Sequence, residues 1–251
     1  MRIAALLPAR LESKRIHQKL LKKIRKVPIF LHTAFRTKLC SMIDEVIICT
    51  DSNKIAEIAK KNKIRVIITK KNLANGTERI ASIIHKIKAD LIIDVHADEA
   101  ILNPNNIKKL INFHKKNFSK FDIVVPHKKS KFSKDENIVK IIFSKNNKIL
   151  YFSRSVAPYP FRKKTSNFYH HLDYISFKPS ALKKFKKFKI GRLEQIEGIE
   201  LLRALENNMN LGTFEISTNT FSINTKEDLR KAKGKFDRDQ FFKKYFEKIK
   251  I

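Results

Sequence analysis

A loop rich in basic residues follows the first apolar run of the chain. The run covers residues 3–7, and the cations Arg10, Lys14, Arg15 and Lys19 come soon after it. In a parallel α/β sheet, ligands bind at the carboxyl ends of the strands, so cations placed there can hold an anion such as a nucleotide phosphate. A solvated basic loop is the alternative in a chain this rich in lysine. The particular order of the residues, rather than the charge alone, supports phosphate binding.

The elements that must position this loop alternate through the first half of the chain. Continuous apolar strands separated by helices predict a parallel sheet covered on both faces. We expect strands at 2–7, 45–49, 65–68, 91–95 and 122–125. We expect helices over 27–39 and 77–87, one capped by Ser52 or Asn53, and one that begins at Pro104.

The pattern changes in the second half of the chain. The apolar segments 138–143 and 149–152 flank a polar stretch, which predicts a β-hairpin. An antiparallel insertion is therefore expected over 128–191, with a polar loop at 162–167. We predict a helix at 193–205, strands at 211–216 and 220–223, and a charged helical tail at 225–250 with an apolar stripe. The predicted fold class is α/β, with three α/β/α layers and a mainly parallel central sheet, in a single domain over 1–251.

The composition leaves two explanations for the charge. With 55 basic and 24 acidic residues, the formal net charge is +31. Such a charge favours binding to nucleic acid, because binding releases counterions. However, abundant Lys, Ile, Asn and Phe with only 5 glycines and no tryptophan is also the profile of an AT-rich genome. Because the lysines are spread over every predicted helix, without arginine clusters interleaved with aromatic residues, we expect no specific nucleic-acid partner.

Membrane insertion and disulfide bonds are not expected. No apolar run approaches the roughly 20 residues that a membrane-spanning helix needs. Pro8 and the charges after it replace the cleavage site of a signal peptide. Cys40 and Cys49 lack the spacing of metal ligands and are expected to be reduced, buried thiols. We therefore expect a cytoplasmic protein.

A series of short motifs runs nearly from end to end of the chain. The opening segment LLPARLESKRIHQKLL is similar to the pattern IIPAR-x-x-S-[TK]-R-[LF]-P-G-K-x-L. The series continues with IICTDSNKIAEIAKK, NGTERI, DVHADEAIL, ILYFSRSVAPYP, HHLDYISF, LEQIEGIELLRALENN and INTKEDL. In this order the motifs resemble the 3-deoxy-manno-octulosonate cytidylyltransferases (CMP-Kdo synthetases), which share the fold of the nucleotide-sugar pyrophosphorylases. Each match is weak alone, and the common order makes the resemblance specific.

This resemblance implies transfer of CMP from CTP to the anomeric hydroxyl of a 2-keto-3-deoxy sugar acid, with release of pyrophosphate, for lipopolysaccharide or surface glycan synthesis. The implied catalytic residues are Arg15, Lys19 and Asp98. The implied nucleotide contacts are Ala9, Arg10, Ser13, Asn75, Gly76 and Thr77, and the implied sugar contacts are His96, Arg154, His171 and Glu194. Mg²⁺, which prefers oxygen ligands, would be bound by Asp98 and Asn224. The family also implies a homodimer formed through the antiparallel insertion.

Several of these residues have structural alternatives. Lys19 could be one more solvated lysine, and Asp98 could cap a turn. Glu197 lies on the same helix face as Glu194 and is expected in a structural ion pair with Arg203.

The neighbouring residues His170, Glu78 and Arg79 are assigned no part in the chemistry. His170 is expected at the surface, whereas His171 fits either the site or the core. Glu78 and Arg79 fit a helix start and a packing role.

The chain departs from the family pattern within the implied site. His17 and Gln18 replace the Pro-Gly that precedes the lysine. If that glycine has a positive φ, Gln18 carries a penalty of about 1 kcal/mol. His96 replaces a glutamine and would share a strand face with Asp94 and Asp98.

Further departures affect the implied metal and sugar contacts. Asn224 replaces an aspartate, which keeps an oxygen ligand but removes a charge, so affinity for the metal should fall. Asp173 and Ile175 replace a glycine and a tyrosine, and the neighbouring Tyr174 would point to the other face of its strand. Ala97 replaces a glycine.

Two accounts of these departures remain open. In one, the protein is active with an altered sugar pocket, in which Asp173 and His96 could suit a substrate with an added amine. In the other, it is a weakly active or inactive relative. The retained set Arg10, Arg15, Lys19, Asp98, Arg154 and His171 favours activity. A non-catalytic basic module that binds nucleic acid is the alternative from another class.

Overall fold

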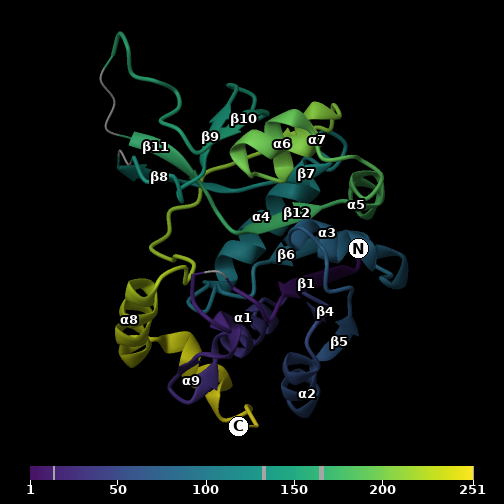
Figure 1. Ribbon diagram of the computed structural model, residues 1–251, viewed down its shortest axis with the longest axis vertical. Helices are drawn as coiled ribbons and strands as arrows, with labels where there is room; N and C mark the ends of the chain where they lie inside the picture. The colour runs from purple at the N-terminus through teal and green to yellow at the C-terminus, as the bar shows by residue number, and fades with distance from the viewer. Residues whose placement is uncertain (14, 132–133, 164–166, 251) are drawn as a thin grey trace. The chain divides into compact units, whose positions relative to one another are not determined.

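The computed structural model describes residues 1–13, 15–131, 134–163 and 167–250, which form two compact units (Figure 1). The first unit contains Met1–Lys109 and Asn219–Ile251, and the second contains Leu110–Thr218. Lys14 and part of the polar loop 162–167 lie outside the described residues. The predicted single domain with an insertion at 128–191 stays a prediction, and the second unit includes that range.

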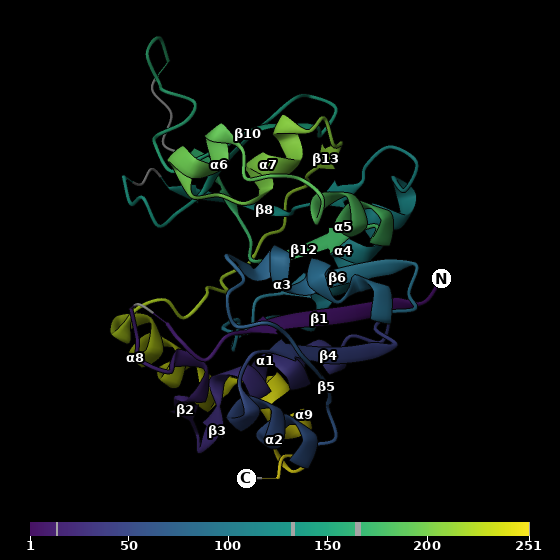
Figure 2. The same ribbon diagram turned by 45° about the vertical axis from the view of Figure 1, so that its right-hand side comes forward.

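The first unit is built on parallel strands. Strand β1 (Ile3–Ala9) pairs in parallel with β4 (Glu45–Thr50) on one side and β6 (Leu91–Val95) on the other, and β5 (Arg65–Ile68) continues the sheet beyond β4. Figure 2 shows β1 between β6 and β4. Every residue of β6 is buried, and β1 is nearly so. The predicted parallel sheet of continuous apolar strands is confirmed here.

Helices cover these strands. Helix α1 (Ile29–Lys38) and helix α2 (Asn53–Lys61) contact β4, and α3 (Gly76–Ser82) contacts β1. The Ser52 side chain accepts a hydrogen bond from the backbone of Ile55, which confirms it as the cap of α2. Helix α1 starts later than predicted, because β2 (Lys23–Ile24) and β3 (Val27–Pro28) pair as a short hairpin before it. A 3₁₀ turn, η2 (Ile84–Lys86), follows α3.

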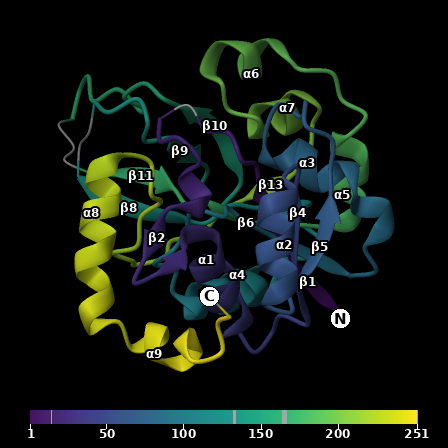
Figure 3. The same cartoon turned by 60° about the horizontal axis from the view of Figure 1, so that its bottom comes forward.

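The end of the chain returns to the first unit. Figure 3 shows α8 (Lys226–Lys235) and α9 (Gln240–Phe246) in yellow, joined by the 3₁₀ turn η3 (Phe236–Arg238). The apolar stripe packs on α1, where Tyr245 stacks on Phe35 and its hydroxyl lies 2.8 Å from Nδ1 of His32. The expected strand at 220–223 is wrong, because this segment has no regular structure and is held by single contacts.

The second unit contains the predicted antiparallel elaboration. A four-stranded sheet has the order β10-β9-β11-β8. Its strands are β8 (His127–Lys131), β9 (Lys140–Phe143), β10 (Ile149–Ser153) and β11 (Asn167–His171). The predicted hairpin is confirmed by the antiparallel pairing of β9 with β10. Its turn includes Asn147 at φ 63, a conformation that asparagine tolerates.

The second unit also contains a short strand, β7 (Ile123–Val124). It pairs with β12 (Tyr174–Phe177) and with β13 (Leu211–Gly212). Helix α5 (Pro179–Phe185) follows β12, and α4 (Pro104–Lys116) begins at Pro104 as predicted. The helix predicted at 193–205 is two helices, α6 (Arg192–Glu197) and α7 (Leu201–Glu206), because Gly198 at φ 62 ends the first. The strand predicted at 211–216 is shorter than expected.

The α/β fold class is confirmed. Both cysteines are buried and free, as predicted. Within the described residues, no helix combines the length and the apolar character needed to cross a bilayer.

Gln18 precedes the 3₁₀ turn η1 (Lys19–Leu21) with φ 47 and ψ 44, so the left-handed conformation inferred for this position is present. We expect Gln18→Gly to raise the free energy of unfolding by about 0.5–1 kcal/mol, because glycine avoids the steric penalty of this conformation. Urea denaturation measures the change. Lys22→Gly is the control, since Lys22 has φ −60 and should gain nothing. Equal effects at the two positions would contradict the prediction.

Candidate functional site

Four polar side chains from distant parts of the sequence meet in the first unit. Nζ of Lys19 forms an ion pair with Asp98 and lies 3.5 Å from Oδ1 of Asn224. Nη2 of Arg15 donates a hydrogen bond to the same oxygen of Asn224 at 2.8 Å. The loop after β1 and the turn after β6 therefore converge, and these four predicted residues are brought together. We call this group the basic cluster.

Backbone contacts hold the two oxygen-bearing members of the basic cluster. The amide of Ile223 donates to the carbonyl of Asp98 at 3.2 Å, which fixes the C-terminal segment beside the turn. The amide of Asn224 donates to Oδ2 of Asp228 at 3.0 Å. Asp228 also forms a reciprocal capping box with Thr225 at the start of α8. Asn224 is thus positioned by the start of a helix.

The charge of the basic cluster favours an anionic ligand. Arg15 and Lys19 supply two positive charges, whereas Asp98 supplies one negative charge and Asn224 none. The side chains of Lys19 and Asp98 are only 12% and 15% exposed, so their interaction is weakly screened by solvent. Arg10, on the same loop, is exposed. An excess of positive charge at the carboxyl end of a central strand suits a phosphate group.

Backbone groups of the predicted nucleotide contacts lie close to the end of β1. A Cβ atom added to Gly76 would lie 3.2 Å from Cγ of Pro8 and 3.9 Å from Nε2 of His96, so glycine permits a close approach of α3 to β1. The Asn75 side chain caps α3 by accepting from Glu78 at 2.8 Å. Thr77 is buried, as is Ala9 in β1, and Ser13 is half-buried.

Sequence reasoning missed one buried ion pair at this end of the sheet. Arg79, expected only to pack, is 2% exposed and its Nη2 lies 3.0 Å from Oδ2 of Asp51. The available signal was an arginine in the otherwise apolar face of a helix, immediately after the NGTE segment. Charged residues are seldom fully buried unless they are paired.

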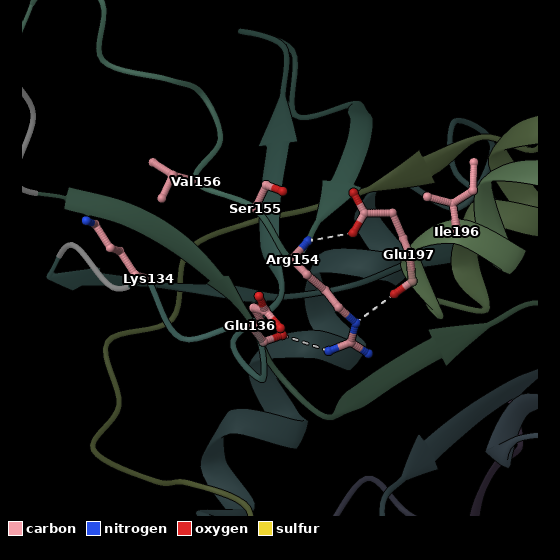
Figure 4. Close-up of a pocket in the computed structure, with 7 residues that line it drawn as sticks. All are labelled: Lys134, Glu136, Arg154, Ser155, Val156, Ile196 and Glu197. Carbon is pink, nitrogen blue, oxygen red and sulfur yellow. Dashed lines mark hydrogen bonds between the residues drawn. The ribbon is translucent and has the colours of Figure 1, made fainter.

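Arg154 lies in the second unit, where its guanidinium holds the wall of a pocket. It donates to the carbonyls of Glu197 at 2.6 Å, Glu136 at 2.8 Å and Gly198 at 3.2 Å. The pocket has a volume of about 400 Å³ and is lined by Lys134, Glu136, Arg154, Ser155, Val156, Ile196 and Glu197 (Figure 4). The buried Lys140 lies behind it and donates to the carbonyl of Arg154 at 2.6 Å.

The partners of the two glutamates of α6 differ from those expected. Glu194 accepts from Nε and Nη2 of Arg203 at 2.5 and 2.6 Å, so the predicted pair of Glu197 with Arg203 is wrong. Glu197 accepts instead from the Ser153 hydroxyl at 3.0 Å and the Arg154 amide at 2.9 Å. The physical reason is the end of α6 at Gly198, which places Glu197 beside β10 and the earlier glutamate beside α7. The sugar contact predicted for Glu194 stays a prediction, although Arg203 engages both of its oxygens.

The histidines at the end of β11 differ in their surroundings. Nδ1 of His171 lies 3.4 Å from Oδ1 of Asp173, so these two candidate residues are in contact. His170 is half-buried rather than at the surface as predicted. Burial, with the nearby Lys128 charge, lowers the pKa of His170 to about 4, so it is neutral at physiological pH. Tyr174 is buried in β12.

The residues of the basic cluster fit the requirements of Mg²⁺. Asp98 and Asn224 offer side-chain oxygens to the same neighbouring lysine. Within the described part of the chain, no group of three or more His, Cys, Asp and Glu residues could hold a metal ion. Mg²⁺ commonly binds through one or two protein carboxylates together with phosphate oxygens and water. A sparse oxygen donor set beside phosphate-binding cations is compatible with that mode.

Comparison with known proteins agrees with this geometry. A family model described as cytidylyltransferase matches residues 4–211. A 3-deoxy-manno-octulosonate cytidylyltransferase from a Nitratiruptor species is 35% identical over 238 residues, which are 92% of this chain and 98% of the relative. A protein of the same name from Rickettsia canadensis is 34% identical over 236 residues, with 92% of this chain and 94% of the relative covered.

Solved structures share the fold. The chain is similar to CMP:2-keto-3-deoxy-manno-octonic acid synthetase complexed with CTP, with a TM-score of 0.87 and 23% identity over 95% of this chain and 99% of that one. A cytidylyltransferase from Leptospira borgpetersenii has a TM-score of 0.65 and 16% identity, covering 99% and 97%. With the family model and two relatives above 30% identity, this chain belongs to the cytidylyltransferase family, in the group of the 3-deoxy-manno-octulosonate cytidylyltransferases.

Proposed function

We propose that the protein transfers CMP from CTP to the anomeric hydroxyl of 3-deoxy-manno-octulosonate, or of a close variant of this sugar acid, and releases pyrophosphate. The observation that carries the proposal is the basic cluster at the end of β1, in a chain 35% identical to a named cytidylyltransferase for this sugar. The product would serve the synthesis of lipopolysaccharide or another surface glycan.

The reaction needs charge neutralisation more than covalent help from the protein. The sugar hydroxyl oxygen attacks the α-phosphorus, a new P–O bond forms, and the bond to the leaving pyrophosphate breaks as the hydroxyl proton departs. Arg15 and Lys19 would neutralise the phosphates, and the exposed Arg10 would add a third cation. Fixed cations of this kind stabilise charge that develops in the transition state.

Mg²⁺ is the proposed cofactor. When bound, the ion would offset the negative charge of the phosphates. Asp98 and Asn224 would hold it. Lys19 forms an ion pair with Asp98, so this lysine offsets the charge of the carboxylate. Asp98 would be a ligand of the cation, and the neighbouring Lys19 would contact the phosphates.

Contacts to the sugar acid are proposed in the second unit. A volume of about 400 Å³ is within the range of small-molecule pockets, and the cations Lys134 and Arg154 could meet a carboxylate. His171 with Asp173 supplies further polar groups. A homodimer formed through the antiparallel sheet and a cytoplasmic location complete the proposal.

Nucleotide selectivity tests the proposal directly. Saturating CTP with Mg²⁺ should raise the melting temperature by about 5–10 °C, because a ligand that binds only the native state stabilises it. ATP and UTP should shift it much less. With 3-deoxy-manno-octulosonate added, pyrophosphate should be released. Equal stabilisation by all polyanions would instead favour the nucleic-acid-binding alternative, and CTP binding without turnover on any sugar acid would indicate an inactive relative.

Lys19 separates the function of the basic cluster from the general basic charge of the chain. We expect Lys19→Met to lower kcat/KM for CTP by about 10²–10³-fold, because one cation is removed from the charge that develops on the phosphates. Lys22→Met is the matched control, since Lys22 is exposed and lies only three positions later. Steady-state pyrophosphate release measures both. A similar loss in the two variants would show that net charge, and not Lys19, is responsible.

Residue 224 tests the metal assignment. We expect Asn224→Asp to tighten Mg²⁺ binding about tenfold, because a charged oxygen ligand replaces a neutral one. Calorimetric titration of Mg²⁺ into the protein with CTP, without sugar acid, gives the affinity independently of turnover. Asn219→Asp, at an exposed position of the same segment, controls for added negative charge. An affinity that stays unchanged in Asn224→Asp would place residue 224 away from the ion.

A further inference from the structure

A buried ion pair joins the carboxyl end of strand β4 to helix α3 in the first unit. Asp51 directly follows β4, and Arg79 projects from α3. Nη2 of Arg79 lies 3.0 Å from Oδ2 of Asp51, and the two side chains are 3% and 10% exposed. Neither residue belongs to the basic cluster.

Arg79 also reaches the segment that follows β5. Its Nη1 donates to the Thr69 hydroxyl and to the Lys70 carbonyl, the latter at 3.2 Å. The amide of Thr69 in turn donates to the carbonyl of Thr50 at 2.8 Å. The planar guanidinium presents several N–H donors in a fixed geometry, so it locks these neighbouring strand ends together.

The second oxygen of Asp51 serves the loop after β1. Oδ1 accepts a hydrogen bond from the backbone amide of Leu11 at 3.3 Å. Leu11 directly follows Arg10 in the loop that leads to Arg15 and Lys19. One carboxylate therefore uses one oxygen for Arg79 and the other for the loop that carries the basic cluster's cations.

We propose that Asp51 and Arg79 are positioning residues that hold the loop after β1 in the conformation that binds the triphosphate, an inference that rests on the proposed function. A lone carboxylate this close to an anion-binding loop would repel phosphate. Because the positive charge of Arg79 offsets the negative charge of the carboxylate, Asp51 can accept a hydrogen bond from the loop with little repulsion of phosphate. Loop ordering before binding lowers the entropy cost of gripping a flexible, charged ligand.

The test compares ligands that differ only in the outer phosphates. CTP and CMP, each with Mg²⁺, are titrated calorimetrically into the full-length protein and into Asp51→Ala, Asp51→Asn and Arg79→Lys. We expect Asp51→Ala to raise the Kd for CTP about tenfold and the Kd for CMP much less, because the loop holds phosphates. Steady-state KM for CTP should rise in parallel, with an unchanged KM for the sugar acid.

An ion pair between β4 and β5 provides the control. Arg65 of β5 and Glu45 of β4 lie 3.0 Å apart at the opposite ends of these strands. Glu45→Gln should leave the ratio of the CTP and CMP affinities unchanged. A purely structural role for Asp51 would lower the melting temperature and the yield of active protein without altering that ratio.

The outcomes separate this inference from the proposed function. A wild-type protein that fails to bind CTP overturns the proposed function. A wild-type protein that binds CTP, with a folded Asp51→Ala variant of the same affinity ratio, overturns only the positioning role. If Asp51→Ala does not fold, Asp51→Asn and Arg79→Lys decide. Asp51→Asn removes the negative charge that pairs with Arg79, and Arg79→Lys removes the planar set of donors that joins Asp51 to Thr69 and Lys70. A reduced ratio in either variant supports the role, and an unchanged ratio in both overturns it.

Discussion

The ion pair between Lys19 and Asp98 depends on the place of β1 in the parallel sheet. Because β1 lies between β4 and β6, and Ala4 pairs with Ile92 while Leu6 pairs with Asp94, the segments that leave β1 and β6 emerge at the same edge. The loop after β1 leads to η1, which places the lysine beside the carboxylate. The order of the strands therefore brings together the backbone segments that carry Lys19 and Asp98.

The sequence predicted the strands of this sheet well for a simple reason. The segments 65–68 and 91–95 are mostly apolar, the first ends before Thr69 and the second lies between Asp90 and His96, and their predicted limits match β5 and β6. The strand expected at 220–223 was inferred from β-forming residues, but strand formation requires a neighbouring strand, and this segment is anchored by single contacts such as that of Ile223. The sequence signal for the break in the helix predicted at 193–205 is Gly198, because glycine commonly ends helices.

Side-chain partners were harder to predict than elements. The order of the motifs grouped Arg15, Lys19, Asp98 and Asn224, and the structure brings them together. The choice between Glu194 and Glu197 as partner of Arg203 could not be made from spacing, because residues three apart share a helix face. It depends on how the turn after α6 directs α7. The contact of Asp51 with Arg79 joins residues 28 positions apart, which no local pattern encodes.

Two departures from the family pattern act on the same loop in physically different ways. Gln18 costs conformational energy just before Lys19, and the fold nevertheless keeps its left-handed backbone. Asn224 changes charge instead. With an aspartate there, Arg15 and Lys19 would face a second carboxylate that competes with phosphate for both cations. With asparagine, Arg15 donates a hydrogen bond to Oδ1 at 2.8 Å, and this bond is weaker than an ion pair between arginine and a carboxylate because its acceptor is neutral. Under the proposed function, the substitution would therefore lower the affinity for a metal ion and leave both cations more available to the triphosphate.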